Sequence, residues 1–110
     1  MNQKRTLIPT FGGAVYVNPE EVCFLKANRH STQMIMEDKE EHRITLSLTQ
    51  AQERLDCPSF IRTHRSYVVN KYQICQVKGA FEWLKLTTRH EIPVSRQRRP
   101  EVRKILNRVE

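Results

Sequence analysis

Glycine and acidic residues are scarce in this sequence of 110 residues. Only three glycines are present, so no glycine-rich loop is available to cradle a nucleotide phosphate. Aspartate occurs only at Asp38 and Asp56, and little acid lies near His64 or His90. A metal-dependent nuclease needs acidic oxygens that converge on a cation. The sequence therefore predicts no enzyme, no cofactor and no metal site.

Long apolar runs and paired cysteine motifs are also missing. No stretch approaches the roughly 20 apolar residues that cross a bilayer. Residues 1–9 lack the apolar segment of a signal peptide, so we expect a cytoplasmic protein without a membrane partner. The cysteines form no CxxC pair and have no histidine at zinc spacing, which predicts buried, reduced thiols at Cys23, Cys57 and Cys75.

Basic residues outnumber acidic ones and are concentrated in two segments. The formal net charge of +7 favours polyanionic partners, which include DNA, RNA and an anionic membrane surface. No Asp or Glu occurs in residues 57–80, and a second basic run covers residues 96–108, whereas residues 37–41 are mostly acidic. Such segregation alone is more often a solvated face than a binding site, so the choice of partner depends on the motifs.

Alternating residues and short apolar runs predict a mainly β domain. Residues 34–36 and the alternating segment 44–48 are expected to form a hairpin across the acidic turn. Residues 1–10 are interpreted as an N-terminal extension and residues 11–110 as a single domain. Strands are expected at residues 15–17, 22–25, 34–36, 44–48, 60–63, 74–77, 81–86 and 92–94.

Two helices are expected beside these strands. Thr49 and Gln52 fit a capping box, in which a hydroxyl and a side-chain amide satisfy free backbone amides at the start of a short internal helix. Pro100 suits the first turn of a C-terminal helix that starts at Arg98 or Arg99. The apolar residues of this second helix recur at amphipathic spacing, at Val102, Ile105, Leu106 and Val109.

Several polar and aromatic residues are expected to have structural roles. Asn70 has the character of a turn residue that bonds its own backbone. The aromatic residues Phe60, Tyr67, Phe81 and Trp83 are expected in the core rather than as base-stacking groups.

Two motifs are more specific than composition. Residues 60–70 read Phe-Ile-Arg-Thr-His-Arg-Ser-Tyr-Val-Val-Asn, and residues 92–96 read Ile-Pro-Val-Ser-Arg. Together with their spacing, these motifs closely resemble the LytTR family of DNA-binding domains over residues 11–107. Thr63 departs from the family pattern, which usually has an aliphatic residue there, and the hairpin turns lack the common glycine.

The resemblance implies both a fold and a function. The fold is an elongated arrangement of short antiparallel strands in about three small sheets, with one short internal helix and a C-terminal helix. The function is sequence-specific binding of duplex DNA by a bacterial transcription regulator, with loops at one edge that enter successive major grooves. Family members typically follow a receiver domain in response regulators and bind promoter direct repeats as dimers. Because the chain has no heptad repeat, we expect the isolated domain to be a monomer.

The candidate DNA contacts lie in three segments. Arg96 is the best candidate base reader, since a guanidinium presents two parallel donors that match guanine O6 and N7 in the major groove. Arg65 can pair with phosphate or base, and His64 can donate to phosphate or brace its loop. The remaining candidates carry polar or basic side chains suited to base edges or phosphates, and they are Asn28, Arg29, His30, Gln33, Ser66, Lys71, Ser95 and Arg99.

Two other classes of module remain open. An RNA-binding β module would expose aromatic side chains for stacking, but only 7% of the residues are aromatic, which favours duplex DNA. A protein-interaction domain would leave both basic segments unexplained.

Overall fold

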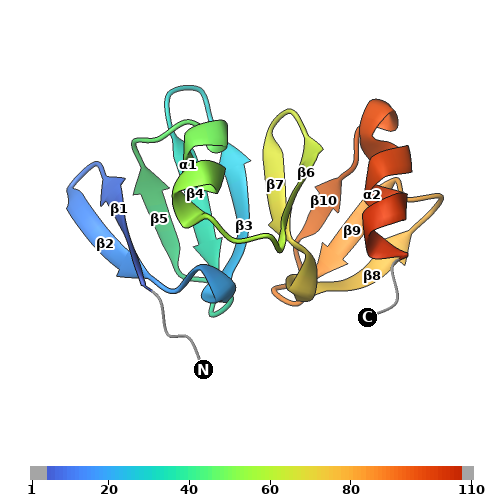
Figure 1. Cartoon of the computed structure of the whole chain (residues 1–110), viewed down its shortest axis with the longest axis horizontal. Coiled ribbons are helices and arrows are strands. Elements are labelled where there is room, and N and C mark those ends of the chain that lie inside the picture. Colours follow the sequence, from blue (N-terminus) through green and yellow to red (C-terminus); the bar gives the residue numbers. More distant parts are fainter. Residues whose placement is uncertain (1–4, 108–110) are drawn as a thin grey trace.

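The protein folds as a mainly β domain, and the computed structural model describes residues 5–107 (Figure 1). The described chain confirms the expected class, with one internal and one C-terminal α-helix. The strands are β1 (Thr6–Thr10), β2 (Gly13–Val17), β3 (Val22–Ala27), β4 (Thr32–Met36), β5 (Glu41–Ile44), β6 (Phe60–His64), β7 (Tyr67–Asn70), β8 (Ile74–Lys78), β9 (Trp83–Leu86) and β10 (Glu91–Pro93). The α-helices are α1 (Leu48–Leu55) and α2 (Arg99–Leu106), and short 3-10 helices lie at Pro19–Glu21, Lys71–Gln73 and Arg96–Arg98.

The strands form two sheets rather than about three. The larger sheet has the order β2-β1-β5-β4-β3-β7-β6, and the smaller has the order β10-β9-β8. The β1–β2 ribbon joins the larger sheet where Thr10 pairs with Ile44, beside a hydrogen bond of 3.3 Å from Phe11 N–H to Arg43 O. The β6–β7 hairpin joins through the antiparallel pairing of β7 with β3. These two junctions fuse three small units into one continuous sheet.

The sheet begins inside the segment that the sequence assigns to an N-terminal extension. Residues 6–10 form β1, and Ile8 at its centre is fully buried. Ile8 pairs with Val15 across the ribbon, so this segment contributes to the core. The domain therefore starts before residue 11.

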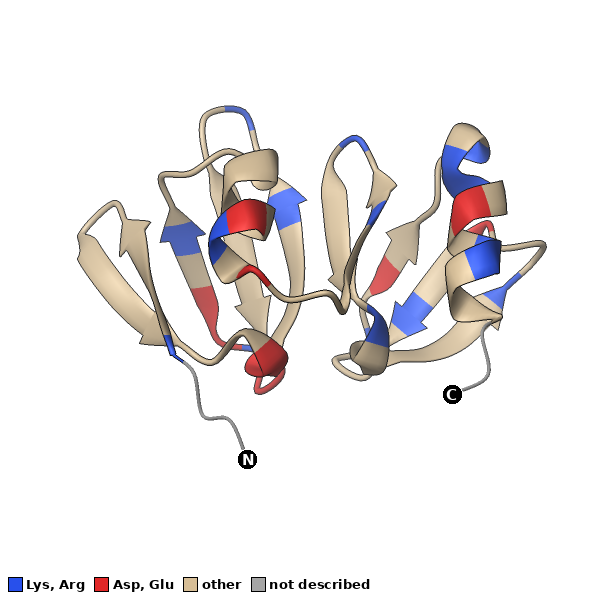
Figure 2. Ribbon diagram, in the orientation of Figure 1, with Lys and Arg blue, Asp and Glu red and all other residues tan. Residues whose placement is uncertain are grey.

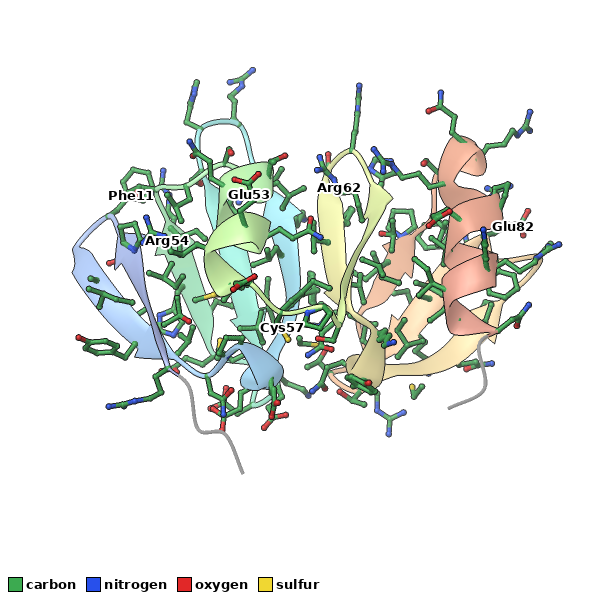
Figure 3. The ribbon with its side chains drawn as sticks, viewed as in Figure 1. Phe11, Glu53, Arg54, Cys57, Arg62 and Glu82 are labelled. Atoms are coloured by element: carbon green, nitrogen blue, oxygen red, sulfur yellow. The ribbon has the colours of Figure 1, made fainter. Side chains whose placement is uncertain are left out.

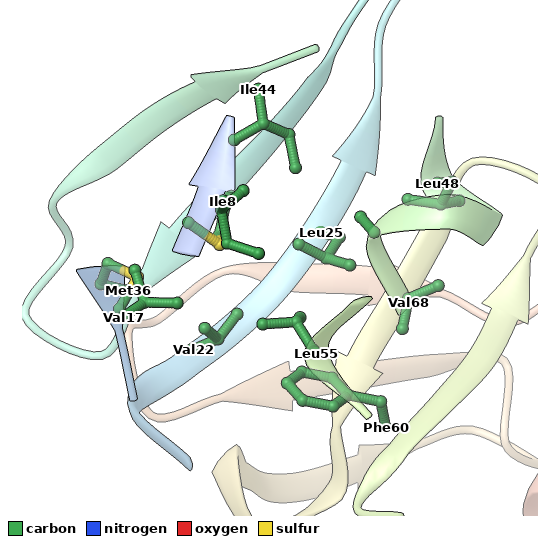
Figure 4. Packing of buried hydrophobic residues seen from close by; sticks show 12 residues of the cluster. Ile8, Val17, Val22, Leu25, Met36, Ile44, Leu48, Leu55, Phe60 and Val68 are labelled. Carbon is green, nitrogen blue, oxygen red and sulfur yellow. The ribbon is translucent and has the colours of Figure 1, made fainter. Parts of the chain in front are cut away.

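The central strands are buried on both faces, which explains their continuous apolar runs. Side chains on one face, including Leu25, Met34 and Val68, pack against α1 in one cluster (Figure 4). The neighbouring residues point to the opposite face because side chains alternate along a strand. There Phe24 and Val69 pack against β9 and β10 of the smaller sheet.

A third cluster joins the hairpin β6–β7 to the C-terminal helix. Ile61 of β6 packs with Leu84, Val94 and Val102, the last of which lies on α2. Ile105 and Leu106 pack at its margin, as the amphipathic spacing predicts. Val109, the fourth residue of that predicted stripe, lies outside the described residues.

Both helices begin close to their expected positions, but the first is capped by a different pair. Ser47 Oγ accepts a hydrogen bond from Gln50 N–H (3.1 Å), and the Gln50 side chain accepts from Ser47 N–H (3.0 Å). The helix begins two residues before the predicted start because Leu48 must face the core beside α1 residues Ala51 and Leu55. In α2, Pro100 lies in the first turn as predicted. Neither helix of the described chain is long and apolar enough to cross a membrane.

Two expectations about buried side chains are corrected. Trp83 is 46% exposed, because it alternates with the buried Leu84 on β9 and so points away from the core. All three cysteines are free, but only Cys23 is buried, whereas Cys57 is partly exposed and Cys75 exposed. Burial raises the pKa of the Cys23 thiol, which keeps it protonated.

As predicted, Asn70 bonds its own segment, because its Oδ1 accepts a hydrogen bond from Tyr72 N–H (3.1 Å).

One buried hydroxyl provides a test of the packing. Thr63 Oγ1 is buried and has no hydrogen-bond partner among the described residues. A buried polar group without a partner costs free energy, and valine has nearly the same shape. We expect Thr63→Val to raise the free energy of unfolding by about 1 kcal/mol and Tm by roughly 5 °C. Thermal and denaturant unfolding measure both quantities.

Thr32 provides the matched control. It is equally buried, but its hydroxyl donates to Leu46 O (2.8 Å). Thr32→Val should therefore lower the free energy of unfolding by about 1 kcal/mol. Destabilisation of the same size in both variants would contradict the assignment of Thr63 as an unpaired group.

Candidate nucleic-acid interface

Several basic side chains gather on one edge of the molecule, and a cluster of acidic side chains lies on the opposite edge. Figure 2 shows Lys or Arg at the tips of the β3–β4 loop and the β6–β7 turn and around the start of α2, all on the upper edge. Acidic residues gather on the opposite edge, on the 3-10 helix Pro19–Glu21 and in the β4–β5 turn. The segregation seen along the sequence is therefore a segregation in space, and the upper edge is the candidate interface for a polyanion.

The β3–β4 loop presents the first group of candidate contacts. Asn28, Arg29 and His30 are exposed, and their side chains have no partner among the described residues. The loop is closed at its base by a hydrogen bond of 2.8 Å from Asn28 N–H to Ser31 O. Because this bond keeps the loop short, the three side chains are exposed to solvent, where each can donate a hydrogen bond to a ligand.

The β6–β7 turn presents the second group, and its geometry is fixed from within. His64 Nδ1 accepts a hydrogen bond from Ser66 N–H (3.1 Å), so the neutral ring carries its hydrogen on Nε2. The ring also packs edge-on against Tyr67, with 5.8 Å between centroids. Arg65 is exposed and its guanidinium has no partner among the described residues. The turn therefore offers Arg65 and the Nε2–H of His64 as outward donors.

The segment that leads into α2 presents the third group. Arg96 is exposed with no side-chain partner in residues 5–107, which leaves its planar fork available. Arg99 is half-buried, and its Nε donates to Val94 O (3.2 Å). Arg99 is thus partly occupied in shaping this segment, whereas Arg96 is wholly available to a ligand. The Ser95 side chain makes no cap to the following 3-10 helix.

Backbone hydrogen bonds join the three segments into one unit. Ala27 N–H, at the start of the β3–β4 loop, donates to Ser66 O in the β6–β7 turn (2.8 Å). Ser95 N–H donates to Thr63 O, just before the same turn (2.9 Å). The β6–β7 turn is therefore the central member, bonded to the segment on either side.

Two of the predicted contact residues lie apart from this group. Gln33 is on β4, half-buried, and its Nε2 donates to Glu41 Oε1 (3.0 Å). Lys71 follows β7 at the end opposite the β6–β7 turn, where its Nζ lies 5.3 Å from the centre of the Tyr72 ring. The other nine predicted residues, in contrast, lie in or beside the three segments of the upper edge.

The site prediction omitted two arginines that lie close together, Arg62 just before the second segment and Arg98 inside the third. Arg62 of β6 is half-buried beside the β6–β7 turn (Figure 3). Desolvation, and then repulsion from Arg98, lower the pKa of Arg62 below its usual range. Arg62 stands inside the quoted motif and Arg98 inside the second basic run, but a one-dimensional pattern gives no sign that they are neighbours. No cluster of His, Cys, Asp and Glu within residues 5–107 could hold a metal ion.

Comparison with known proteins identifies the architecture. The sequence profile described as the LytTr DNA-binding domain matches residues 12–107. The chain belongs to the LytTR family of DNA-binding domains. The LytTR domain of a methyl-accepting/DNA response regulator from Bacillus cereus has the same fold, with a TM-score of 0.79 and 24% identity. The match covers 97% of this chain and 100% of that one.

A curated relative places the LytTR domain in a longer protein. The sensory transduction protein LytT of Enterococcus faecalis is 27% identical over 83 residues. The match covers 73% of this chain but only 34% of the relative. The chain thus spans about a third of the length of LytT.

The arrangement of the edge predicts which residues respond to a polyanion. Addition of duplex DNA to isotope-labelled domain should shift the backbone amide resonances of residues 28–31, 65–66 and 95–99 most. Those of the acidic turn, residues 37–40, should not move, because like charge excludes the phosphate backbone. The measurement is a two-dimensional NMR titration at low salt.

The same titration tests whether Lys71 and Gln33, which lie apart from the three segments, contact DNA. Lys71 and Gln33 should show small shifts compared with Arg65. The largest shifts at Lys71 and its neighbours would instead place the interface on the opposite edge.

Proposed function

We propose that this LytTR domain reads a specific duplex DNA sequence through its upper edge, with loops that enter successive major grooves. The observation that carries the proposal is the set of three exposed arginines, Arg29, Arg65 and Arg96, one on each hydrogen-bonded segment. Each guanidinium lacks a partner within the described chain and can donate two parallel hydrogen bonds.

The dimensions of the domain support contact with more than one groove. Its longest extent is 40 Å, and the upper edge runs along this axis in Figure 1. Successive major grooves on one face of B-DNA are roughly 34–36 Å apart. The whole domain is thus about as long as this groove spacing, and the three segments, which occupy part of that length, are proposed to address neighbouring grooves without a recognition helix.

Arg96 is the proposed base reader, and its neighbours orient it. Its fork matches the two acceptors of guanine, O6 and N7, whereas a lysine ammonium supplies only a point charge. Ser95, bonded to Thr63 O, and Arg99, bonded to Val94 O, hold the backbone on either side of Arg96. A side chain that starts from a fixed backbone loses less freedom on binding.

Duplex DNA is favoured over single-stranded RNA by the positions of the aromatic residues. Recognition of single strands depends on bases stacked against exposed aromatic rings. The large exposed aromatic residues are Phe11, Tyr16, Tyr72 and Trp83. None of them belongs to the three basic segments, and the guanidinium of Arg43 covers the Phe11 ring at 4.4 Å.

The proposed biological role is supported by the family and by the curated relative. We infer that the domain is the DNA-binding part of a bacterial transcription regulator of the response-regulator type, in which a receiver domain accompanies it. Two copies are expected on a promoter with direct repeats, and the isolated domain is expected to be a monomer.

Arg96→Lys tests the assignment of the base reader. The binding site is first defined by selection of duplexes from a random pool with the parent domain. Arg96→Lys keeps the charge but loses the fork, so affinity for the selected duplex should fall by roughly 1–3 kcal/mol. Affinity for random duplex should change little, because phosphate contacts depend on charge. Fluorescence anisotropy with both duplexes measures the two affinities.

The control is Arg103→Lys on α2. Arg103 is exposed, lies one helical turn beyond the third segment, and is held over the Phe81 ring at 5.2 Å. Its replacement should leave the ratio of specific to random affinity unchanged. If Arg96→Lys keeps the parent's ratio of specific to random affinity, Arg96 does not read a base. If selection from the random pool yields no common sequence, specific recognition itself is contradicted.

A further inference from the structure

Arg62 makes contacts with the β6–β7 turn that no other side chain in residues 5–107 duplicates. Its Nε donates to His64 O (2.8 Å) and its Nη2 donates to Arg65 O (2.6 Å). A third, longer bond of 3.4 Å runs from Nη1 to Thr49 Oγ1 in the first turn of α1. Thr49 accepts this bond because Ser47, and not Thr49, caps the helix. One guanidinium thus joins two consecutive carbonyls of the turn to a helix of the core.

The turn itself has little intrinsic preference for its shape. His64 pairs with Tyr67, so Arg65 and Ser66 form a two-residue connection. Such connections favour Gly or Asn at positive φ, but neither residue is Gly or Asn, and neither adopts positive φ. The strand register also shifts between Arg62 and His64. The conformation of this turn therefore depends on hydrogen bonds, namely the one within it from Ser66 N–H to His64 Nδ1 and those that Arg62 and Ala27 make to its carbonyls.

The charge of Arg62 is not used in an ion pair. Its partners are neutral oxygens, and within residues 5–107 no carboxylate lies at salt-bridge distance. Arg98 is near enough to repel it. A half-buried cation beside another cation is costly, and a polar or apolar residue would avoid that cost. The forked geometry of Arg62, rather than a contribution to the core, accounts for an arginine at this position.

We propose that Arg62 is a positioning residue for DNA recognition, which fixes the β6–β7 turn so that Arg65 and the Nε2–H of His64 face the major groove. This role rests on the proposed function. Arg62 acts through the turn and reaches the DNA through no contact of its own. The fork is required, because its donors sit on separate nitrogens at a fixed spacing that matches the two carbonyls, whereas the donors of a lysine ammonium all leave one nitrogen.

Arg62→Lys and Arg62→Gln test the proposal, with Thr49→Val as the matched control. Both Arg62 variants should lose roughly tenfold affinity for the selected duplex, the loss expected for hydrogen bonds to a charged group. The lysine variant, which keeps the charge, should keep its affinity for random duplex. In the free protein, the Ser66 amide should exchange faster with solvent and the amide resonances of residues 64–66 should shift. Thr49→Val removes only the longest contact and should change affinity by less than about twofold.

The outcomes distinguish a positioning role of Arg62 from a merely stabilising one. Equal loss on selected and random duplexes in Arg62→Lys would indicate general destabilisation and overturn the proposal. Parent-like affinity and unchanged turn resonances in this variant would overturn it as well. Failure of the proposed function has a different signature, namely a parent domain that does not prefer any selected duplex. The resonances of residues 64–66, measured without DNA, still decide in that case whether Arg62 fixes the turn.

Discussion

The backbone hydrogen bonds around the β6–β7 turn are the constraint on which the candidate interface depends. Ala27 N–H donates to Ser66 O on one side, and Ser95 N–H donates to Thr63 O on the other. These two bonds fix the relative positions of three segments that are far apart in the sequence. Without them, each basic loop would meet a polyanion independently and would lose conformational freedom on binding.

The packing beneath the edge explains why those bonds form in one arrangement. Strands β3, β4, β6 and β7 are buried on both faces, between α1 on one side and the smaller sheet with α2 on the other. A one-residue slip in register would exchange Leu25 with Phe24 between two different clusters. The core therefore fixes the strand register, the register fixes the turns, and the turns direct the exposed arginines. Among the described residues, none of the fully buried polar side chains is charged.

Alternation and helical spacing predicted the mainly β class, most strands and the amphipathic face of α2. The alternating segment 44–48 was wrongly predicted as a strand, because β5 ends at Ile44 and Leu48 begins α1. The same patterns could not predict that Ser47 rather than Thr49 caps α1, because both residues fit a cap and the choice depends on where Leu48 meets the core. Nine of the eleven candidate contacts lie on the basic edge, but the separation of Lys71 depends on the direction of β7. The role proposed for Arg62 could not be predicted from the sequence either. Its partners are backbone carbonyls, which every residue has, so no residue type marks them.

The proposed function requires that the upper edge enter two neighbouring major grooves of one duplex. Protection of guanine N7 from methylation, on a selected duplex that binds a single domain, tests it most directly, because N7 lies in the major groove. We expect protected guanines in two groups on one face of the duplex, roughly 10 base pairs apart. Protection confined to one group, or binding that leaves every guanine N7 reactive while the minor groove is blocked, would contradict it.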